Sequence, residues 1–256
     1  MKKYYLSLFT ALLMLFTAGL SHAQVKIYTK KALMEDFNSK TTKVVAAGQS
    51  ILARILQEEV EGRWRHSPYE FCSDSEYEAL KESNDYYFLY LNKEDGIVFL
   101  NLSKGGKKDD ENNKARPVDV VRIPIAAEAS DGIKDARFVG YAIDAIQNFA
   151  LQAMESDQVG YKGLSAFNSK KLEGRKVYLD EEQAYSALEA CENNAAAGIV
   201  IAPDNLSFDS FCYKIIITTD THEVVYFDKK KYKSPTEKEF NDKERNSINR
   251  RNGNIM

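Results

Sequence analysis

Residues 138–154 read FVGYAIDAIQNFALQAM, the most apolar helical stretch of the chain outside its N-terminus. Two adjacent stripes of apolar side chains repeat along it at helical spacing, one through Phe138 and Phe149 and the other through Val139 and Ala150. The polar remainder lacks the Lys and Arg of a membrane-surface helix and consists of Asp144, Gln147, Asn148 and Gln152. The stretch therefore predicts a central helix that is buried between other elements.

Strand and helix patterns alternate before this helix. An apolar strand at 44–47 precedes Ser50, a helix N-cap residue, and an amphipathic helix at 51–60. A strand at 69–72 then meets a capping box of Ser73 and Glu76. Strands at 86–91 and 97–102 flank an Asp-Gly turn, which is typical of a hairpin. Residues 24–126 are thus predicted to form a first α/β module.

The segment 103–117 is polar, contains Gly105 and Gly106 and carries charges of both signs. It predicts a solvated loop before a further strand at 118–125. A phosphate-binding role would require a Walker pattern leading into a helix, and the segment has neither.

A second α/β module is predicted at 161–228, after the central helix and a connector at 127–160. Its patterns are a strand at 176–179, a strand at 197–202 and a hairpin of strands at 213–219 and 223–227. Between the first two strands, Asp180 caps a helix whose inner face runs from Ala184 to Cys191. Phe-Asn-Ser-Lys occurs at both 37–40 and 167–170, which suggests an internal repeat. The expected fold class is α+β, with two related β-α-β-type modules and antiparallel or mixed sheets around the central apolar helix.

The N-terminus has the pattern of a cleavable export signal. Lys2 and Lys3 precede an apolar run, and Ser21-His22-Ala23 places small residues at the −1 and −3 positions of a cleavage site before Gln24. We therefore expect a signal peptide at 1–23, a periplasmic or secreted protein, and no transmembrane anchor after cleavage.

Charge is segregated along the remaining chain. The whole sequence has 35 Lys and Arg against 38 Asp and Glu, a composition that argues against a basic nucleic-acid-binding domain. Residues 229–256 hold nine of these basic residues and four of the acidic ones. They predict a solvated, partly helical basic tail, and the alternative is a tail that touches an anionic surface.

Few residues offer catalytic or metal-binding chemistry. His66 and His222 are the only histidines after the signal, and Gly163 to Phe167 has Phe where a nucleophile elbow requires Gly. The three cysteines, of which at most one pair can join within the chain, are Cys72, Cys191 and Cys212. The sequence does not choose among the pairings or exclude three free thiols. We therefore assign no catalytic, cofactor-binding or metal-binding residue.

Three segments carry a resemblance: Tyr69 to Ser73, Tyr77 to Lys81 and Asp85 to Leu89. Together they resemble uncharacterised exported proteins of Bacteroides-type bacteria, and the hairpin at 212–228 is similar to the closing segment of that group. At the level of the fold, the element order is similar to small α/β domains of envelope assembly proteins. The resemblance contains no chemical motif, and no functional residues carry over from it.

These patterns favour a non-enzymatic binding or assembly accessory protein of the bacterial cell envelope. Its expected partner is an envelope protein or a surface polymer, and neither a nucleic acid nor a cofactor is expected. Two alternatives stay open: a periplasmic small-molecule or lipid binder with a deep apolar pocket, and a hydrolase with an unrecognised site.

Overall fold

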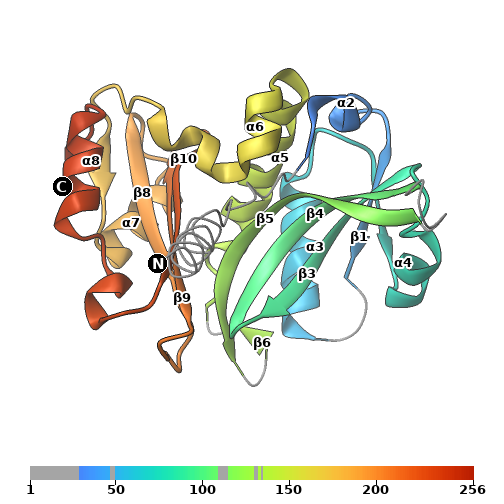
Figure 1. Cartoon of the computed structure of the whole chain (residues 1–256), viewed down its shortest axis with the longest axis horizontal. Coiled ribbons are helices and arrows are strands. Elements are labelled where there is room, and N and C mark those ends of the chain that lie inside the picture. Colours follow the sequence, from blue (N-terminus) through green and yellow to red (C-terminus); the bar gives the residue numbers. More distant parts are fainter. Residues whose placement is uncertain (1–28, 47–49, 109–114, 130–131, 134) are drawn as a thin grey trace, which may run out of the picture.

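The computed structural model describes residues 29–46, 50–108, 115–129, 132–133 and 135–256. The expected signal at 1–23 and the centre of the polar loop, 109–114, lie outside the described residues. Two mixed β-sheets stand side by side, with helices between and around them (Figure 1). The predicted fold class, α+β with two similar sheet modules, is confirmed.

The first sheet has the strand order β2-β1-β3-β4-β5-β6. Its strands are β1 (Thr41–Val45), β2 (Tyr69–Cys72), β3 (Tyr86–Glu94), β4 (Ile97–Lys108), β5 (Ala115–Ala129) and β6 (Gly132–Ile133). β1 runs parallel to β2 and β3, and β4 and β5 continue the sheet antiparallel. Its helices are α2 (Lys31–Met34), α3 (Ile51–Arg63) and α4 (Asp74–Leu80). β5 passes the module boundary expected at residue 126 because Glu128 and Ala129 pair with β6.

The second sheet has the strand order β10-β9-β8-β7-β11. Its strands are β7 (Lys176–Tyr178), β8 (Ala195–Ile201), β9 (Phe211–Thr218), β10 (Val224–Lys231) and β11 (Asn254–Ile255). β7 runs parallel to β8 and β11, and β9 and β10 are antiparallel. Its helices are α7 (Glu181–Glu189), the 3₁₀ helix η2 (Pro235–Lys238) and α8 (Asp242–Arg250).

The two sheets share one layout. Counted from the parallel edge, β2-β1-β3-β4-β5 and β11-β7-β8-β9-β10 have the same order and the same relative directions. The repeated Phe-Asn-Ser-Lys precedes β1 in one module and β7 in the other, and Phe37 and Phe167 are both buried. The edge strands differ in origin, since β2 follows α3 directly whereas β11 is supplied by the C-terminus. A common ancestry of the modules stays a prediction.

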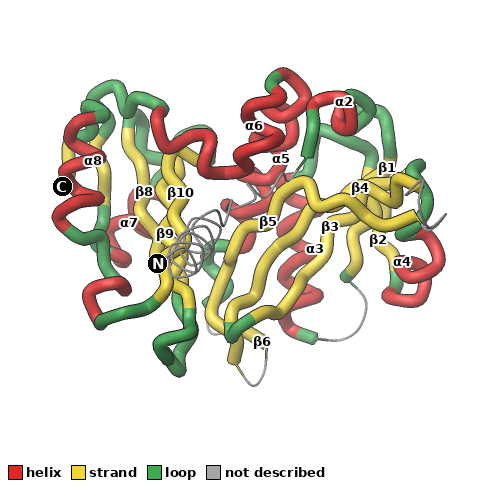
Figure 2. Tube along the Cα trace, viewed as in Figure 1, coloured by secondary structure: helices red, strands yellow, loops and turns green. Residues whose placement is uncertain are grey.

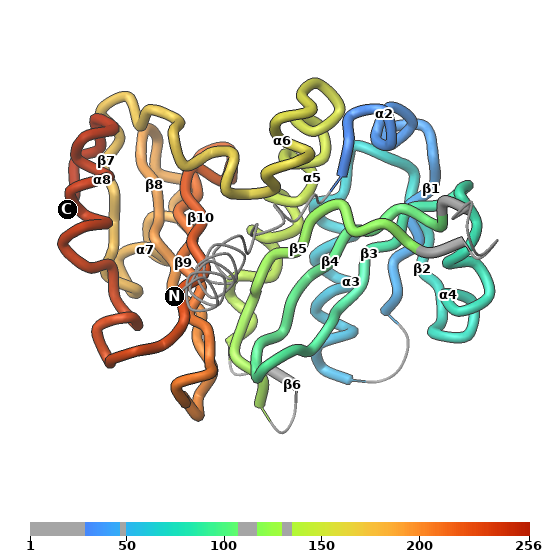
Figure 3. The backbone as a smooth tube through the Cα atoms, viewed as in Figure 1, coloured from blue at the N-terminus to red at the C-terminus, as the bar shows by residue number. Residues whose placement is uncertain are grey.

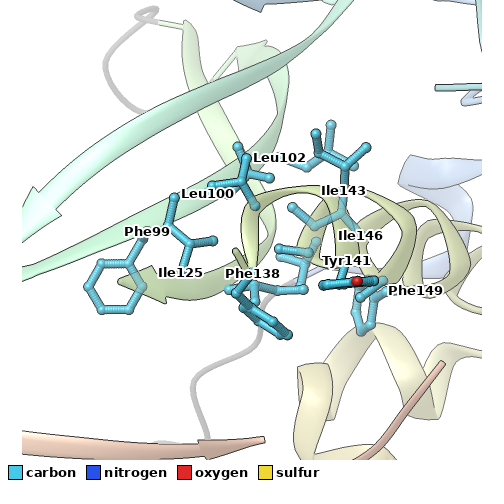
Figure 4. Close-up of a cluster of buried hydrophobic side chains, with 14 of the residues drawn as sticks. Phe99, Leu100, Leu102, Ile125, Phe138, Tyr141, Ile143, Ile146 and Phe149 are labelled. Atoms are coloured by element: carbon cyan, nitrogen blue, oxygen red, sulfur yellow. The ribbon is translucent and has the colours of Figure 1, made fainter. Parts of the chain in front are cut away.

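The central helix is α5 (Val139–Glu155), and α6 (Asp157–Lys162) and the 3₁₀ helix η1 (Gly163–Ser169) follow it. α5 contacts α2, α3, β4 and β5. Figure 4 shows Ile143, Ile146 and Phe149 of this helix beside Leu100 and Leu102 of β4. The same continuous core includes residues of the second sheet, such as Ile199 and Ile215. The prediction of a central buried helix is therefore confirmed.

Two expectations about polar segments are wrong. Ser103 to Lys108 belongs to β4, and β5 already begins at Ala115, because the two strands pair far beyond the predicted hairpin, from Ile97↔Ala127 to Lys108↔Ala115. A strand ladder satisfies backbone groups whatever the polarity of the side chains, so composition alone misplaced the loop.

The segment 229–256 is partly helical, as expected, but it is not a separate solvated tail. Lys229 to Lys231 lie in β10, and β11 adds the C-terminal residues to the outer edge of β7. The C-terminus lies beside α8, on the outer side of the second sheet (Figures 2 and 3). Phe240 and Ile248 are buried in a second apolar cluster against Val177 and Ile216. Apolar residues spaced widely among charges thus attach this segment to the second sheet.

Gly105 is required where β4 passes the loop after α4. A Cβ at this position would lie 1.8 Å from the carbonyl oxygen of Ser83, and this oxygen belongs to the backbone. We expect Gly105→Ala to lower the free energy of unfolding by about 2–3 kcal/mol, as overpacking does. A Cβ at Gly62 in α3 would have no other atom within 4 Å. Gly62→Ala is therefore the control and should raise the free energy of unfolding by about 0.5–1 kcal/mol. Urea denaturation measures both, and an equal effect of the two variants would contradict this assignment.

Candidate functional site

A groove lies between the two modules and consists of two adjoining cavities of about 860 Å³ and about 420 Å³. The cavities share Pro203 and Asp204. The larger one lies where β7 and β8 end, and β5 borders it from the first module. Crevices beyond the carboxyl ends of parallel strands are the usual ligand sites of α/β sheets, and this volume is in the range of such sites.

Small side chains keep the groove open along both modules. Ala126, Ala127 and Ala129 of β5 line one side, and Gly198 and Ala202 line the other. Gly198 has no space for a larger residue, because a Cβ there would lie 2.7 Å from Leu179 and 2.9 Å from Phe240. These two side chains therefore pack directly over the β8 backbone and form part of the lining.

Arg137, just before α5, links the modules at the groove. Its guanidinium donates to Asp135 at 2.8 Å and to Glu181 and Glu182 of α7 at 3.2 and 3.3 Å. It also stacks over the ring of Tyr185 at 4.0 Å. The hydrogen bond to Asp135 is the main reason that the pKa of Arg137 is raised, so this side chain stays charged and fixed.

The opposite wall comes from the C-terminal segment, which contributes Lys238, Glu239, Phe240 and Arg245. A buried ion pair holds this segment on the sheet: Lys214 of β9 is 0% exposed, and its Nζ donates to Glu244 at 2.8 Å. Lys230 of β10 also donates to Glu244. Glu244 closes a capping box with Asn241 at the start of α8. The position of this wall therefore depends on Glu244 and on one lysine from each of the strands β9 and β10.

Among the residues that the structure describes, the lining of the groove has more acidic than basic side chains. Its two cavities are lined by seven carboxylates, Asp95, Glu128, Asp135, Asp180, Glu181, Asp204 and Glu239. Three basic side chains, Arg137, Lys238 and Arg245, share the lining. All three border the larger cavity, whereas the charged side chains lining the smaller one are all acidic.

A second polar cluster joins α3, α5 and the turn between β9 and β10. His222 Nδ1 lies 2.7 Å from Asp144, which also accepts from Arg63 at 2.7 Å, and Arg63 in turn pairs with Glu59. The rings of His222 and Tyr141 pack edge to face, with their centroids 5.0 Å apart. His222 Nε2 is buried and lacks a hydrogen-bond partner in the described part of the chain. Through Asp144, the His222 ring and Arg63 link α3, α5 and the β9–β10 turn.

The other residues considered from the sequence for catalysis or metal binding lie in separate parts of the fold. His66 is exposed, and its backbone N–H donates to Gln147 at 3.3 Å. Ser165 lies in the 3₁₀ helix η1 and donates to the carbonyl of Lys162, so the near match to a nucleophile elbow forms no elbow. Between 29 and 256, excluding the undescribed positions, no group of three or more His, Cys, Asp or Glu is placed to hold a metal ion.

The three cysteines are free thiols. Cys72 and Cys212 are buried, and burial raises the pKa of each thiol, which disfavours the reactive thiolate. Cys191 was expected on the inner face of α7 and is exposed instead. The helix ends at Glu189, and the positive φ of 46° at Cys191 turns this residue away from the helical stripe.

The sequence did not reveal the groove, because its lining comes from segments spread between Asp95 and Arg245. Its one local signal is Pro203-Asp204-Asn205, which ends β8 at the rim. In the parts of the chain that are described, no helix has the length and apolar character needed to span a membrane. No protein-family model, no curated protein and no solved structure shows a significant match to the chain.

Proposed function

We propose that this chain is an exported, non-enzymatic accessory protein of the bacterial cell envelope that binds a partner in the groove between its modules. The observation that supports this function is the composition of the groove wall, to which both modules contribute: β5 from one, and β8, α7 and the C-terminal segment from the other. An occupant would contact both modules at once. The periplasmic or secreted location rests on the N-terminal sequence pattern and is part of the proposal.

The outer edge of the second sheet supports a binding role less well than the groove does. The outer edge of β10 is partly covered, since the side-chain amide of Asn168 donates to the Phe227 carbonyl and accepts from the Phe227 N–H, both at 2.8 Å. Arg251 donates to the Val225 carbonyl on the same strand. Such coverage protects an edge strand from adding another chain.

The lining also weighs against the lipid-binding alternative. That function would require a deep apolar pocket. Eight of the 19 residues that line the larger cavity are charged, and Asp135, Arg137 and Asp204 are among them. A polar partner fits this lining better than an acyl chain, because burying charged side chains against hydrocarbon is costly.

Site-specific photocrosslinking tests the proposed function. A photoreactive residue at Ala127, which is half-buried in the groove, should give a discrete adduct in cells of the producing bacterium. The same residue at Glu58, exposed on α3, is the matched control and should not give that adduct. Adding Ala202→Trp, which fills the groove from the β8 side, should reduce the Ala127 adduct at least about tenfold. Equal adducts from both positions, or none from Ala127, would count against the groove as the binding site.

A further inference from the structure

The groove is elongated and follows one strand. The larger cavity touches Ile125, Ala126 and Ala127 of β5, and the smaller one touches Glu128 and Ala129, the next two residues. At about 3.3 Å per residue, five consecutive strand residues span about 15 Å. A groove of this length accommodates about five residues of an extended peptide.

The charges along this length are uneven. Asp95, Glu128 and Asp204 border the smaller cavity. Glu128 is partly neutralised by Lys93 at 3.1 Å, and Asp95, at the exposed hairpin turn, has no ion-pair partner in the described chain. Lys238 and Arg245 lie in the wall of the other cavity. Among the described residues of the lining, seven carboxylates stand against three basic side chains, and the charged ones at the smaller cavity are all acidic.

The chain's own basic C-terminal segment is not the occupant. Lys229 to Lys231 are in β10, and Lys238 and Arg245 form part of the lining. The C-terminal segment therefore forms part of the groove wall, and the ligand that we consider comes from another molecule.

Resting on the proposed function, we infer that the groove binds an extended basic peptide segment of a partner protein, with a Lys or Arg side chain over Asp95, Glu128 and Asp204. The small side chains of β5 and β8 leave space in the groove for the main chain of a peptide. The acidic smaller cavity selects the basic side chain, since opposite charges across an interface favour encounter and register.

Fluorescence anisotropy of the purified protein with defined probes tests this inference. The first probe is a labelled eight-residue peptide of alternating Ala and Lys, the second alternates Ala and Glu, and unlabelled hexaamminecobalt(III) serves as a compact polycation competitor. We expect the Ala-Lys peptide to bind, its affinity to fall as salt is added, and the Ala-Glu peptide to bind at least about tenfold more weakly. Hexaamminecobalt(III) should compete poorly, because this compact ion cannot extend along the length of the groove.

The variants separate a specific groove from general acidity. A triple variant should bind the Ala-Lys peptide about tenfold more weakly, because each of three exposed charge contacts contributes modestly to affinity. It combines Asp95→Asn, Glu128→Gln and Asp204→Asn. The matched control combines Glu58→Gln, Glu61→Gln and Glu82→Gln, which removes the same charge from exposed positions away from the groove and should change affinity by no more than about twofold. Circular dichroism checks that both variants fold.

Equal losses in both triple variants, equal binding of the Ala-Glu peptide, or competition by hexaamminecobalt(III) as strong as by the unlabelled peptide would overturn the inference. Its failure is distinguishable from that of the proposed function. If the Ala127 adduct forms in cells and survives the Asp95, Glu128 and Asp204 substitutions, the groove is a binding site whose partner is not basic. If the Ala127 adduct is also absent, both the inference and the proposed function are wrong.

Discussion

Replacing Glu244 with Gln is expected to lower the free energy of unfolding by about 3 kcal/mol, because it leaves the charge of Lys214 buried without its carboxylate. Lys214 is 0% exposed, and the next carboxylate oxygen, on Glu237, is 4.0 Å from its Nζ. Lys230 loses the same partner but can turn toward solvent. The loss should appear in urea denaturation as a lower midpoint with an unchanged slope.

Two variants make the Glu244 result specific. Glu239→Gln removes a charge from the same segment at an exposed position and should change stability by less than about 0.5 kcal/mol. Combining Lys214→Met with Glu244→Leu removes both members of the buried pair and should restore most of the loss, since apolar residues often replace such a pair without cost. If Glu244→Gln has no more effect than Glu239→Gln, the pair does not anchor the segment.

The same residue makes stability depend on pH. Burial by itself raises the pKa of Glu244, but hydrogen bonds from Lys214, Lys230 and the Asn241 N–H outweigh it and hold the pKa below its usual 4.5. The contribution of Glu244 is therefore present above about pH 4.5 and is lost as pH falls through the lowered value. Wild-type stability should decline more steeply below that pH than the stability of Glu244→Gln. Part of the decline should persist, because the pKa values of Asp36 and Asp220 are lowered as well.

Phe149→Ala in α5 is expected to lower the free energy of unfolding by about 3–5 kcal/mol, the range for replacing a fully buried Phe with Ala. Phe149 is 1% exposed and meets the edge of the Phe167 ring at 6.2 Å. Because one continuous core contains α5 and residues of both sheets, the loss should weaken both modules together. Phe208→Ala, at a side chain that is 76% exposed in the second module, is the control and should change stability by less than about 0.5 kcal/mol.

The only Trp provides the readout for this cooperativity. Trp64 is buried in the first module beside Phe37, so its fluorescence reports that module, whereas far-ultraviolet circular dichroism reports all helices and strands. In Phe149→Ala both signals should shift to the same lower urea midpoint. A Trp64 transition that keeps its wild-type midpoint while the dichroism shifts would show that α5 does not couple the modules.

The helix starts were predictable because their hydrogen bonds are local. Ser50 accepts from the Ala53 N–H, Ser73 and Glu76 form the expected capping box, and Asp180 accepts from the Gln183 N–H. Each of these contacts spans three residues, so the sequence contains both partners within one turn. The two polar segments were misjudged for the opposite reason. Ser103 pairs with Asp119, and Lys214 needs Glu244, and neither partner is marked by any local pattern.

The sequence by itself determined the fold class, the order of the main strands and helices from β1 to β10, and the central position of α5, since apolar periodicity and capping residues act over a few neighbours. The tertiary structure alone decided that the basic C-terminal segment completes the second sheet and that a groove follows β5. It also decided that the charges of Asp95, Glu128 and Asp204 meet at one end of that groove. These features depend on contacts between residues tens to more than a hundred positions apart, and only the packing of two sheets around one helix brings them together.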